Sequence, residues 1–397
     1  MDLSALGQRE LDLPALRADL EATVAAGELA GASYAVLTRE GLVASACVGW
    51  ADREAGVAMR PDHLFRIYSN TKLVTSCAAL QLLEQGRFGL DDPVAAHLPA
   101  LQGLRVLRPG AVTLHDTEAL REPIRIRHLF THTAGFTYAY REPGTLLGQA
   151  YQAANLADPA LDSRHFLQAL ARLPLVFQPG SAWNYSVATD VLGVLVEAAS
   201  GLPLDAYFQR HIFDPLDMRD TFFWAPPDKA QRLAPMYLQS GVGGLVRAEG
   251  DFPHRGAFLT PQARLSGGGG LVSSLRDFSR LVGTLLAGGA PLLSPQSMPL
   301  LLDNQLPAGM WIGKPPLEGR GHSCAASVTQ QVSPTNPATA VGEVQWGGVG
   351  GTHWFFSPSE NLAVVLMAQR FMGYGLPFWL RFKQAVRRAM ADRHTAC

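Results

Sequence analysis

The sequence of 397 residues has few lysines, few cysteines and no long apolar or like-charged run, and most of these shortages argue against a class of protein. No apolar stretch reaches the roughly 18 residues of a membrane-spanning helix, so we expect no membrane span. The net charge is −1 without a block of one sign, so we expect no nucleic-acid partner. The first residues hold no basic segment followed by an apolar one, so we expect no secretory signal peptide.

The four cysteines make no C-x-x-C pair and no spacing typical of metal ligands. They are Cys47, Cys77, Cys324 and Cys397. We expect them to stay reduced in a cytoplasmic protein, with secretion and paired cysteines as the alternative. His128 and His132 have the spacing of a zinc-binding helix, but Leu129 occupies the glutamate position of H-E-x-x-H. We therefore expect no metal and no other cofactor.

Only four of the 33 basic residues are lysines, and one of them, Lys72, follows Ser69 by three positions in Ser69-Asn70-Thr71-Lys72. Residues three apart lie one turn apart on the same face of a helix. A helix beginning at Ser69 would place the hydroxyl at its positive end, with the ammonium beside it. Because lysine can release a proton and arginine cannot, this pattern predicts a nucleophilic serine assisted by a lysine. The alternative is a solvated lysine on an ordinary helix.

A second candidate, Tyr185, follows the turn Gln178-Pro179-Gly180 and precedes an apolar segment expected to be helical. A tyrosine at such a turn can lie at the edge of a cleft. Its phenol has an ordinary pKa of about 10, so a nearby cation is needed to favour the phenolate. Lys72 could be that cation. The alternative is a turn tyrosine packed on the helix that follows it.

The third candidate is the run Trp346-Gly347-Gly348-Val349. Paired glycines in a strand let another backbone or a ligand approach closely. A backbone N–H of this run could therefore share an oxyanion with the N–H of Ser69. The alternative is a β-bulge or an edge strand.

Periodicity predicts strands at both ends of the chain and helices in the middle. The expected helices are 11–28, 73–85, 275–288 and 377–392, and the expected strands are 32–38, 42–50, 344–348, 352–357 and 362–368. This order favours an α+β fold with one antiparallel sheet flanked by helices. We expect residues 1–86 and 290–397 to form an α/β domain, 87–289 to form a mostly helical inserted domain, and the active site to lie in the cleft between them.

Taken together and in this order, the three motifs resemble those of the serine β-lactamase-like superfamily, most closely the class C enzymes and the related family VIII carboxylesterases. The resemblance extends to Leu90-Asp91-Asp92-Pro93-Val94, to residues 128–135 and to the glycines at 267–270. It implies a β-lactamase/DD-peptidase-like fold. No G-x-S-x-G motif occurs, which argues against an α/β-hydrolase.

The resemblance also implies roles for the candidate residues. Ser69 would be the acylated nucleophile, and Lys72 and Tyr185 the paired proton-transfer groups. The backbone amides of Ser69 and Val349 would form the oxyanion hole. Which of Lys72 and Tyr185 is the base for acylation stays open, because coupled groups titrate as a pair.

Two positions depart from the β-lactamase pattern. Trp346-Gly347-Gly348 stands where those enzymes carry Lys-Thr-Gly, so an apolar wall replaces a cation that would meet a carboxylate. Val187 stands in place of the asparagine of Tyr-x-Asn. We expect these four residues, Val187 and 346–348, to contact the substrate.

These departures favour hydrolysis of short- to medium-chain esters through an acyl-serine intermediate, with at most weak β-lactamase activity. The expected partner is a small-molecule ester. The alternatives are an acyltransferase on the same scaffold, a non-catalytic binding protein and a penicillin-recognising peptidase. The sequence leaves the oligomeric state open.

Overall fold

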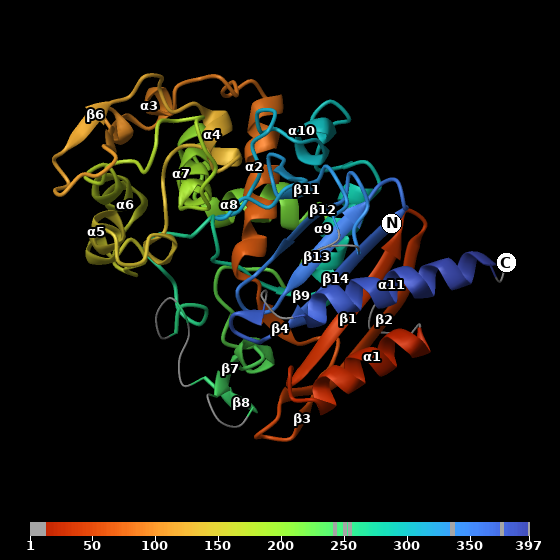
Figure 1. The fold of residues 1–397 in the computed structure, drawn as a ribbon. Helices are drawn as coiled ribbons and strands as arrows, with labels where there is room; N and C mark the ends of the chain where they lie inside the picture. Colours follow the sequence, from red (N-terminus) through yellow and green to blue (C-terminus); the bar gives the residue numbers. More distant parts are fainter. Residues whose placement is uncertain are drawn as a thin grey trace.

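An eight-stranded antiparallel sheet forms the centre of the molecule (Figure 1). The computed structural model describes residues 13–240, 244–248, 252, 256–333, 338–373 and 377–395. The strand order is β10-β11-β12-β13-β14-β1-β2-β3. The strands are β1 (Gly31–Thr38), β2 (Gly41–Asp52), β3 (Val57–Ala58), β10 (Arg320–His322), β11 (Ser327–Thr329), β12 (Val344–Gly347), β13 (His353–Ser357) and β14 (Leu362–Ala368). Because β1 pairs with β14, both ends of the chain build this sheet, as predicted.

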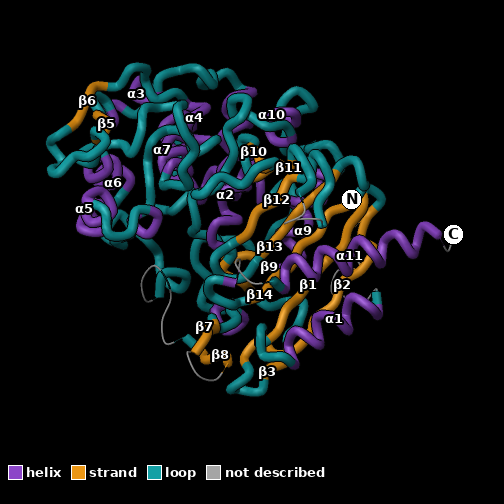
Figure 2. Tube along the Cα trace, in the orientation of Figure 1, coloured by secondary structure: helices purple, strands orange, loops and turns teal. Residues whose placement is uncertain are grey.

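The central strands are buried on both faces, which explains their continuous apolar sequences. In β1, Tyr34 and Val36 pack against helices on one face, and Ala35 and Leu37 pack into the main core on the other. This alternation follows from the two-residue period of a strand. Figures 1 and 2 show α1 (Pro14–Ala25) and α11 (Phe378–Thr395) crossing the first face. Helix α9 (Leu275–Leu286) packs against β1, β13 and β14.

The middle of the chain contributes most of the remaining helices, which gather beside one end of the sheet (Figure 2). They are α2 (Thr71–Glu84), α3 (Val94–His97), α4 (Ile126–Phe130), α5 (Leu146–Ala154), α6 (Ser163–Leu170), α7 (Ala188–Ser200), α8 (Leu204–Phe208) and α10 (Met298–Leu302). Helix α2 is buried on all sides from Thr71 to Leu82 and packs against α7. A helix without a polar face is typical of a core position.

Three two-stranded sheets were not predicted. They pair β4 (Leu64–Arg66) with β9 (Val272–Ser274), β5 (Arg105–Leu107) with β6 (Thr117–Ala119), and β7 (Tyr237–Ser240) with β8 (Gly244–Arg247).

The predicted helix 11–28 corresponds to α1, and residues 11 and 12 lie outside the described residues. Cys397 and the N-terminal residues considered for a signal peptide also lie outside them. The division at residues 289 and 290 stays a proposal, and α9, assigned there to the helical part, packs on the sheet.

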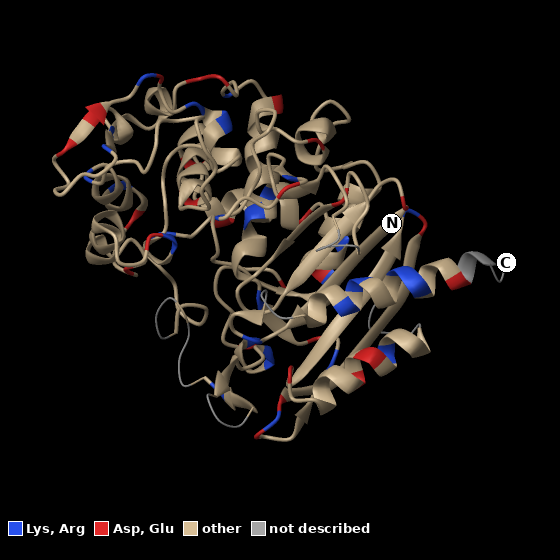
Figure 3. Ribbon diagram, in the orientation of Figure 1, with Lys and Arg blue, Asp and Glu red and all other residues tan. Residues whose placement is uncertain are grey.

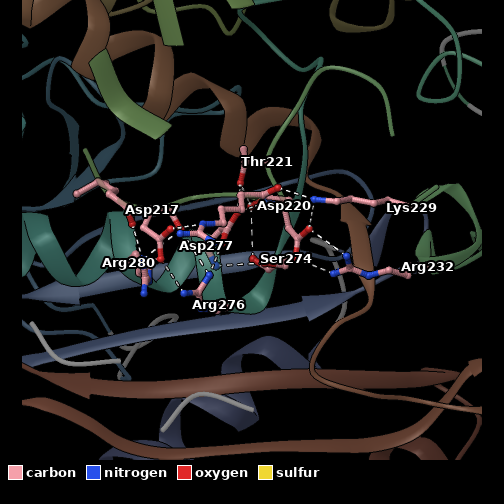
Figure 4. Close-up of polar contacts among 12 residues, drawn as sticks. Asp217, Asp220, Thr221, Lys229, Arg232, Ser274, Arg276, Asp277 and Arg280 are labelled. Carbon is pink, nitrogen blue, oxygen red and sulfur yellow. Dashed lines mark hydrogen bonds and ion pairs between the residues drawn. The ribbon is translucent and has the colours of Figure 1, made fainter. Parts of the chain in front are cut away.

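A network of ion pairs fixes residues 217–232 against the start of α9 (Figure 4). Asp277 is fully buried and accepts hydrogen bonds from the Asp220 N–H at 2.6 Å and the Thr221 hydroxyl at 3.0 Å. Burial raises the pKa of Asp277 to about 6. Two further carboxylates pair with cations: Asp217 with Arg276 and Arg280, and Asp220 with Lys229 and Arg232.

Charged residues of both signs are interspersed over the elements (Figure 3). No single described helix has the length and apolar composition to cross a membrane, although the bent pair Ala188–Ser200 and Leu204–Phe213 passes the same test by length and composition. Within the described ranges, no group of three or more His, Cys, Asp or Glu side chains is arranged to hold a metal ion.

Candidate active site

Ser69 lies in a 3-10 helix, Tyr68–Asn70, and α2 begins two residues later at Thr71. The prediction of a helix beginning at Ser69 is therefore corrected to a 3-10 turn that leads into the α-helix. Tyr68 has φ of 43°, a left-handed conformation uncommon for a residue other than glycine. Its buried ring packs edge-on against Phe258, with centroids 5.2 Å apart. Packing thus holds the strained residue that presents Ser69, which is partly exposed.

Lys72 is 3% exposed, so the alternative of a solvated lysine is wrong. Its Nζ donates to the Gly268 carbonyl at 2.6 Å and to the Tyr138 hydroxyl at 3.4 Å. The same Nζ lies 4.6 Å from the centroid of the Tyr185 ring. Burial and the charge of Asp190 raise the pKa of Tyr138 well above its ordinary value, so Tyr138 is a neutral phenol. The ammonium is therefore held by one carbonyl and two tyrosines.

The hydroxyl of Tyr185 donates to Ser69 Oγ at 2.6 Å. The chain before it is fixed by Asn184, which is buried and donates from Nδ2 to Phe136 O at 3.1 Å and Thr137 Oγ1 at 2.9 Å. The structure thus brings Tyr185, Ser69 and Lys72 together from segments far apart in the sequence.

The end of β12 lies beside the Ser69 segment. Asn70 Nδ2 donates to Thr352 Oγ1 at 2.9 Å, and the Gly348 N–H donates to Thr352 O at 2.7 Å. A Cβ on Gly348 would overlap the Ile67 carbonyl, so only glycine allows this approach. Because β12 pairs with both β11 and β13, the alternative of an edge strand is wrong.

The remaining candidates differ in their exposure. Val349 and Trp346 are partly exposed, and the Trp346 ring lies 5.5 Å from the Tyr185 ring between centroids. Gly347 is also partly exposed, at the end of β12. Val187 is 5% exposed and packs in the main core, so substrate contact by its side chain stays a prediction.

Two buried histidines pack against the aromatic rings of the candidate site. His132 is edge-on to the Tyr185 ring with centroids 5.0 Å apart, and His322 lies 5.5 Å from the Trp346 ring. Burial lowers the pKa of His132 well below its ordinary value and that of His322 to about 4. Both are therefore neutral near pH 7 and support the aromatic rings. His322 was missed in the sequence, since an isolated histidine there carries no motif.

The glycines at 267–270 form a close backbone passage between α2 and α7. The hydroxyl of Thr75 on α2 donates to the Gly267 carbonyl at 2.7 Å, and Thr71 Oγ1 accepts from the Leu271 N–H at 3.1 Å. Gly268 supplies the carbonyl that meets Lys72. Sequence reasoning missed this contact, because any residue type supplies a backbone carbonyl.

Cavity size does not identify the site. Two cavities, of about 490 and 360 Å³, are lined by residues other than Ser69, Lys72 and Tyr185. The larger one includes Asp52, Arg66 and Arg247, and the smaller one includes Arg127 and Cys324. The chemistry around Ser69 is therefore the stronger guide.

Comparison with known proteins gives matches along nearly the whole chain. Residues 16–376 match the family model described as Beta-lactamase. The chain is 32% identical over 403 residues to Esterase EstB of Burkholderia gladioli, covering 95% of this chain and 96% of that protein. It is 34% identical over 371 residues to Protein Rv1367c of Mycobacterium tuberculosis, covering 90% of each. The solved structure of EstCE1, a hydrolase with promiscuous acyltransferase activity, has a TM-score of 0.79 and 27% identity, covering 94% of this chain and 97% of that one.

Proposed function

Because this chain belongs to the beta-lactamase family, we propose that it is a serine esterase that cleaves short- to medium-chain esters through an acyl-serine intermediate. Membership of the family confirms the resemblance inferred from the three motifs, and the antiparallel sheet flanked by helices confirms the fold class. The observation that carries the proposal is the 2.6 Å hydrogen bond from Tyr185 to Ser69 Oγ, beside a lysine that is 3% exposed.

The proposed reaction has two steps. Ser69 Oγ attacks the ester carbonyl carbon and gives its proton to the Lys72 and Tyr185 pair, which passes a proton to the leaving alkoxide. The alcohol departs and the acyl group stays on Ser69. Water then attacks the acyl-enzyme, its proton enters the same pair, and Ser69 leaves with a proton restored. The backbone amides of Ser69 and Val349 would stabilise the oxyanion in both steps.

The substrate preference rests on what surrounds this pair. Trp346 presents an aromatic ring to Tyr185, where a cation would suit a β-lactam carboxylate. Tyr138 stacks on Tyr140 with centroids 5.2 Å apart, which adds a second aromatic wall. Apolar walls favour an uncharged ester over an anionic lactam. A cytoplasmic location is part of the proposal, supported by the buried thiols Cys77 and Cys324, which a reducing compartment preserves.

Acyl transfer to an alcohol is the second candidate, and the likeness to EstCE1 favours it, since that hydrolase has promiscuous acyltransferase activity. The same acyl-serine would react with an alcohol in place of water. Product analysis with and without added alcohol separates the two: ester products at low alcohol concentration would favour transfer, and acid alone would favour hydrolysis.

The decisive experiment is intact-protein mass spectrometry after treatment with a fluorophosphonate, with p-nitrophenyl butyrate and nitrocefin turnover measured in parallel. We expect an adduct on wild type and on Ser181→Ala, a matched variant of an exposed serine, and none on Ser69→Ala. Ester turnover should greatly exceed nitrocefin turnover. Fast nitrocefin turnover would refute the substrate preference, and the absence of both adduct and turnover would favour a binding protein.

A further inference from the structure

Asp190 lies in the first turn of α7, five residues after Tyr185, and is 6% exposed. Its carboxylate gathers donors from one segment of the chain. Oδ1 accepts from Ser266 Oγ at 2.6 Å, from Arg264 Nη1 at 3.1 Å and from the Gly268 N–H at 3.4 Å. One carboxylate therefore fixes three positions of the segment 264–268.

Further contacts hold the segment 264–268 against this carboxylate. A Cβ on Gly268 would overlap Asp190 Oδ2, so the backbone lies directly against the side chain. Arg264 is itself held, with its guanidinium 4.1 Å from the centroid of the Phe166 ring and a hydrogen bond to the Leu156 carbonyl at 3.0 Å. From the opposite side, Thr75 bonds the Gly267 carbonyl.

The fixed segment delivers one functional atom, the Gly268 carbonyl oxygen, to Lys72 Nζ at 2.6 Å. Within the described part of the chain, no carboxylate lies within 4.0 Å of Lys72 Nζ, so this carbonyl is its shortest polar contact. The position of Nζ, 4.6 Å from the centroid of the Tyr185 ring, depends on where this oxygen lies. The chain around the start of α7 thus serves both partners of the nucleophile: Tyr185 lies three residues before the helix, and Asp190 in its first turn holds the segment whose Gly268 carbonyl meets Lys72.

We propose that Asp190 is a positioning residue for the reaction, which clamps residues 264–268 so that the Gly268 carbonyl orients Lys72 toward Tyr185 and Ser69. This inference rests on the proposed function. Asp190 acts through the backbone of this segment. Removing its charge weakens the hold on the segment, so we expect a slower chemical step with substrate binding kept.

The test compares Asp190→Asn with Asp277→Asn. Asp277 is a matched control because it is a buried aspartate at the third position of α9, as Asp190 is at the third position of α7, and it lies outside the candidate site. With p-nitrophenyl butyrate, we expect Asp190→Asn to lower kcat by about 10- to 100-fold with KM within about threefold.

Ser266→Ala tests the same contact from the other side, since it removes a donor to the Asp190 carboxylate and leaves the carboxylate in place. We expect a several-fold loss of kcat with KM nearly unchanged, whereas Asp277→Asn keeps wild-type kcat per folded molecule. If Asp190→Asn does not fold, the Ser266→Ala result decides alone, and an unchanged kcat overturns the proposal. Wild-type kcat in folded Asp190→Asn would overturn it as well.

The labelling rate of Ser69 by a fluorophosphonate keeps this test independent of the ester substrate. A wild type that is labelled but hydrolyses no ester would refute the proposed esterase, and the relative labelling rates would still decide on Asp190. Slower labelling of Asp190→Asn than of Asp277→Asn supports the positioning role, and equal rates overturn it. A wild type that is neither labelled nor active would overturn the nucleophile on which both proposals depend.

Discussion

Tyr185 contributes one hydroxyl to the candidate site, and removing that hydroxyl tests its role directly. Tyr185→Phe keeps the ring against Trp346 and loses the donor to Ser69 Oγ. We expect kcat for p-nitrophenyl butyrate to fall by about 10² to 10⁴, with KM nearly unchanged, because proton transfer is lost while binding is kept. Tyr207→Phe is the control, since its buried hydroxyl bonds Gln81 away from the site. Equal activity in the two variants would contradict the prediction.

Substitution of Lys72 tests whether this buried side chain must release a proton during the reaction. Lys72→Arg keeps the positive charge, but a guanidinium stays protonated at any working pH. We therefore expect ester turnover to fall by at least about 10³, measured in the same steady-state assay. Lys229→Arg provides the comparison, since Lys229 pairs with Asp220 outside the site. A Lys72→Arg variant with substantial activity would show that charge alone suffices.

Gly348 sets how closely β12 approaches the Ser69 segment, which is a property of two elements together. A methyl group at this position would meet the Ile67 carbonyl, a backbone atom that a side-chain rotation cannot move away. We expect Gly348→Ala to lower kcat by about tenfold or more through displacement of the Val349 amide. Gly269→Ala is the control, because an added Cβ there meets no atom closer than 3.8 Å. Activity equal to this control would refute the role of the close approach.

Asp277 makes the start of α9 sensitive to pH. Its folded-state pKa of about 6 lies above its ordinary value of 3.8, so the folded protein binds the proton more tightly than the unfolded chain. The corresponding stability is present below about pH 4 and is lost as the pH rises through 6. We expect Asp277→Asn, measured by urea unfolding, to gain stability relative to wild type between pH 4 and pH 7, by about 3 kcal/mol at most. A difference independent of pH would contradict this.

The elements also show how far sequence alone leads. Strands β1, β13 and β14 carry long apolar runs and were predicted within one or two residues. The small sheets escaped prediction because strands of three or four residues are too short to show a two-residue alternation. Ser69, Lys72 and Tyr185 were found because their side chains carry the chemistry. The Gly268 carbonyl and the aromatic contact of His322 were not, because they depend on where the fold places ordinary atoms.

At the scale of the whole molecule, α11 holds the two ends of the chain together across one face of the sheet. Phe382 is fully buried, with its ring 5.6 Å from that of Tyr34 on β1. We expect Phe382→Ala to reduce the free energy of unfolding by about 3 to 5 kcal/mol. Activity per folded molecule should be unchanged at low temperature, because Phe382 packs in the cluster on one face of the sheet, whereas Val187 and Trp346 of the candidate site pack in the main core. Unfolding in denaturant measures the change in stability. A loss of activity without a loss of stability would contradict the expectation that activity is unchanged.

The pairing of β1 with β14 has a consequence for biosynthesis. Ala32 lies opposite Ala368, so the first strand to leave the ribosome waits for a partner more than 300 residues later. At translation rates of about 5 to 20 residues per second, that wait is roughly 15 to 65 s. Until then the apolar strands β1 and β2 have only each other and the short β3, while the segments that surround Ser69, which include Tyr185, Gly268 and Gly348, are all made before β14. The nascent chain therefore carries an incomplete sheet edge, and chaperones that cover exposed strands should bind it before synthesis ends.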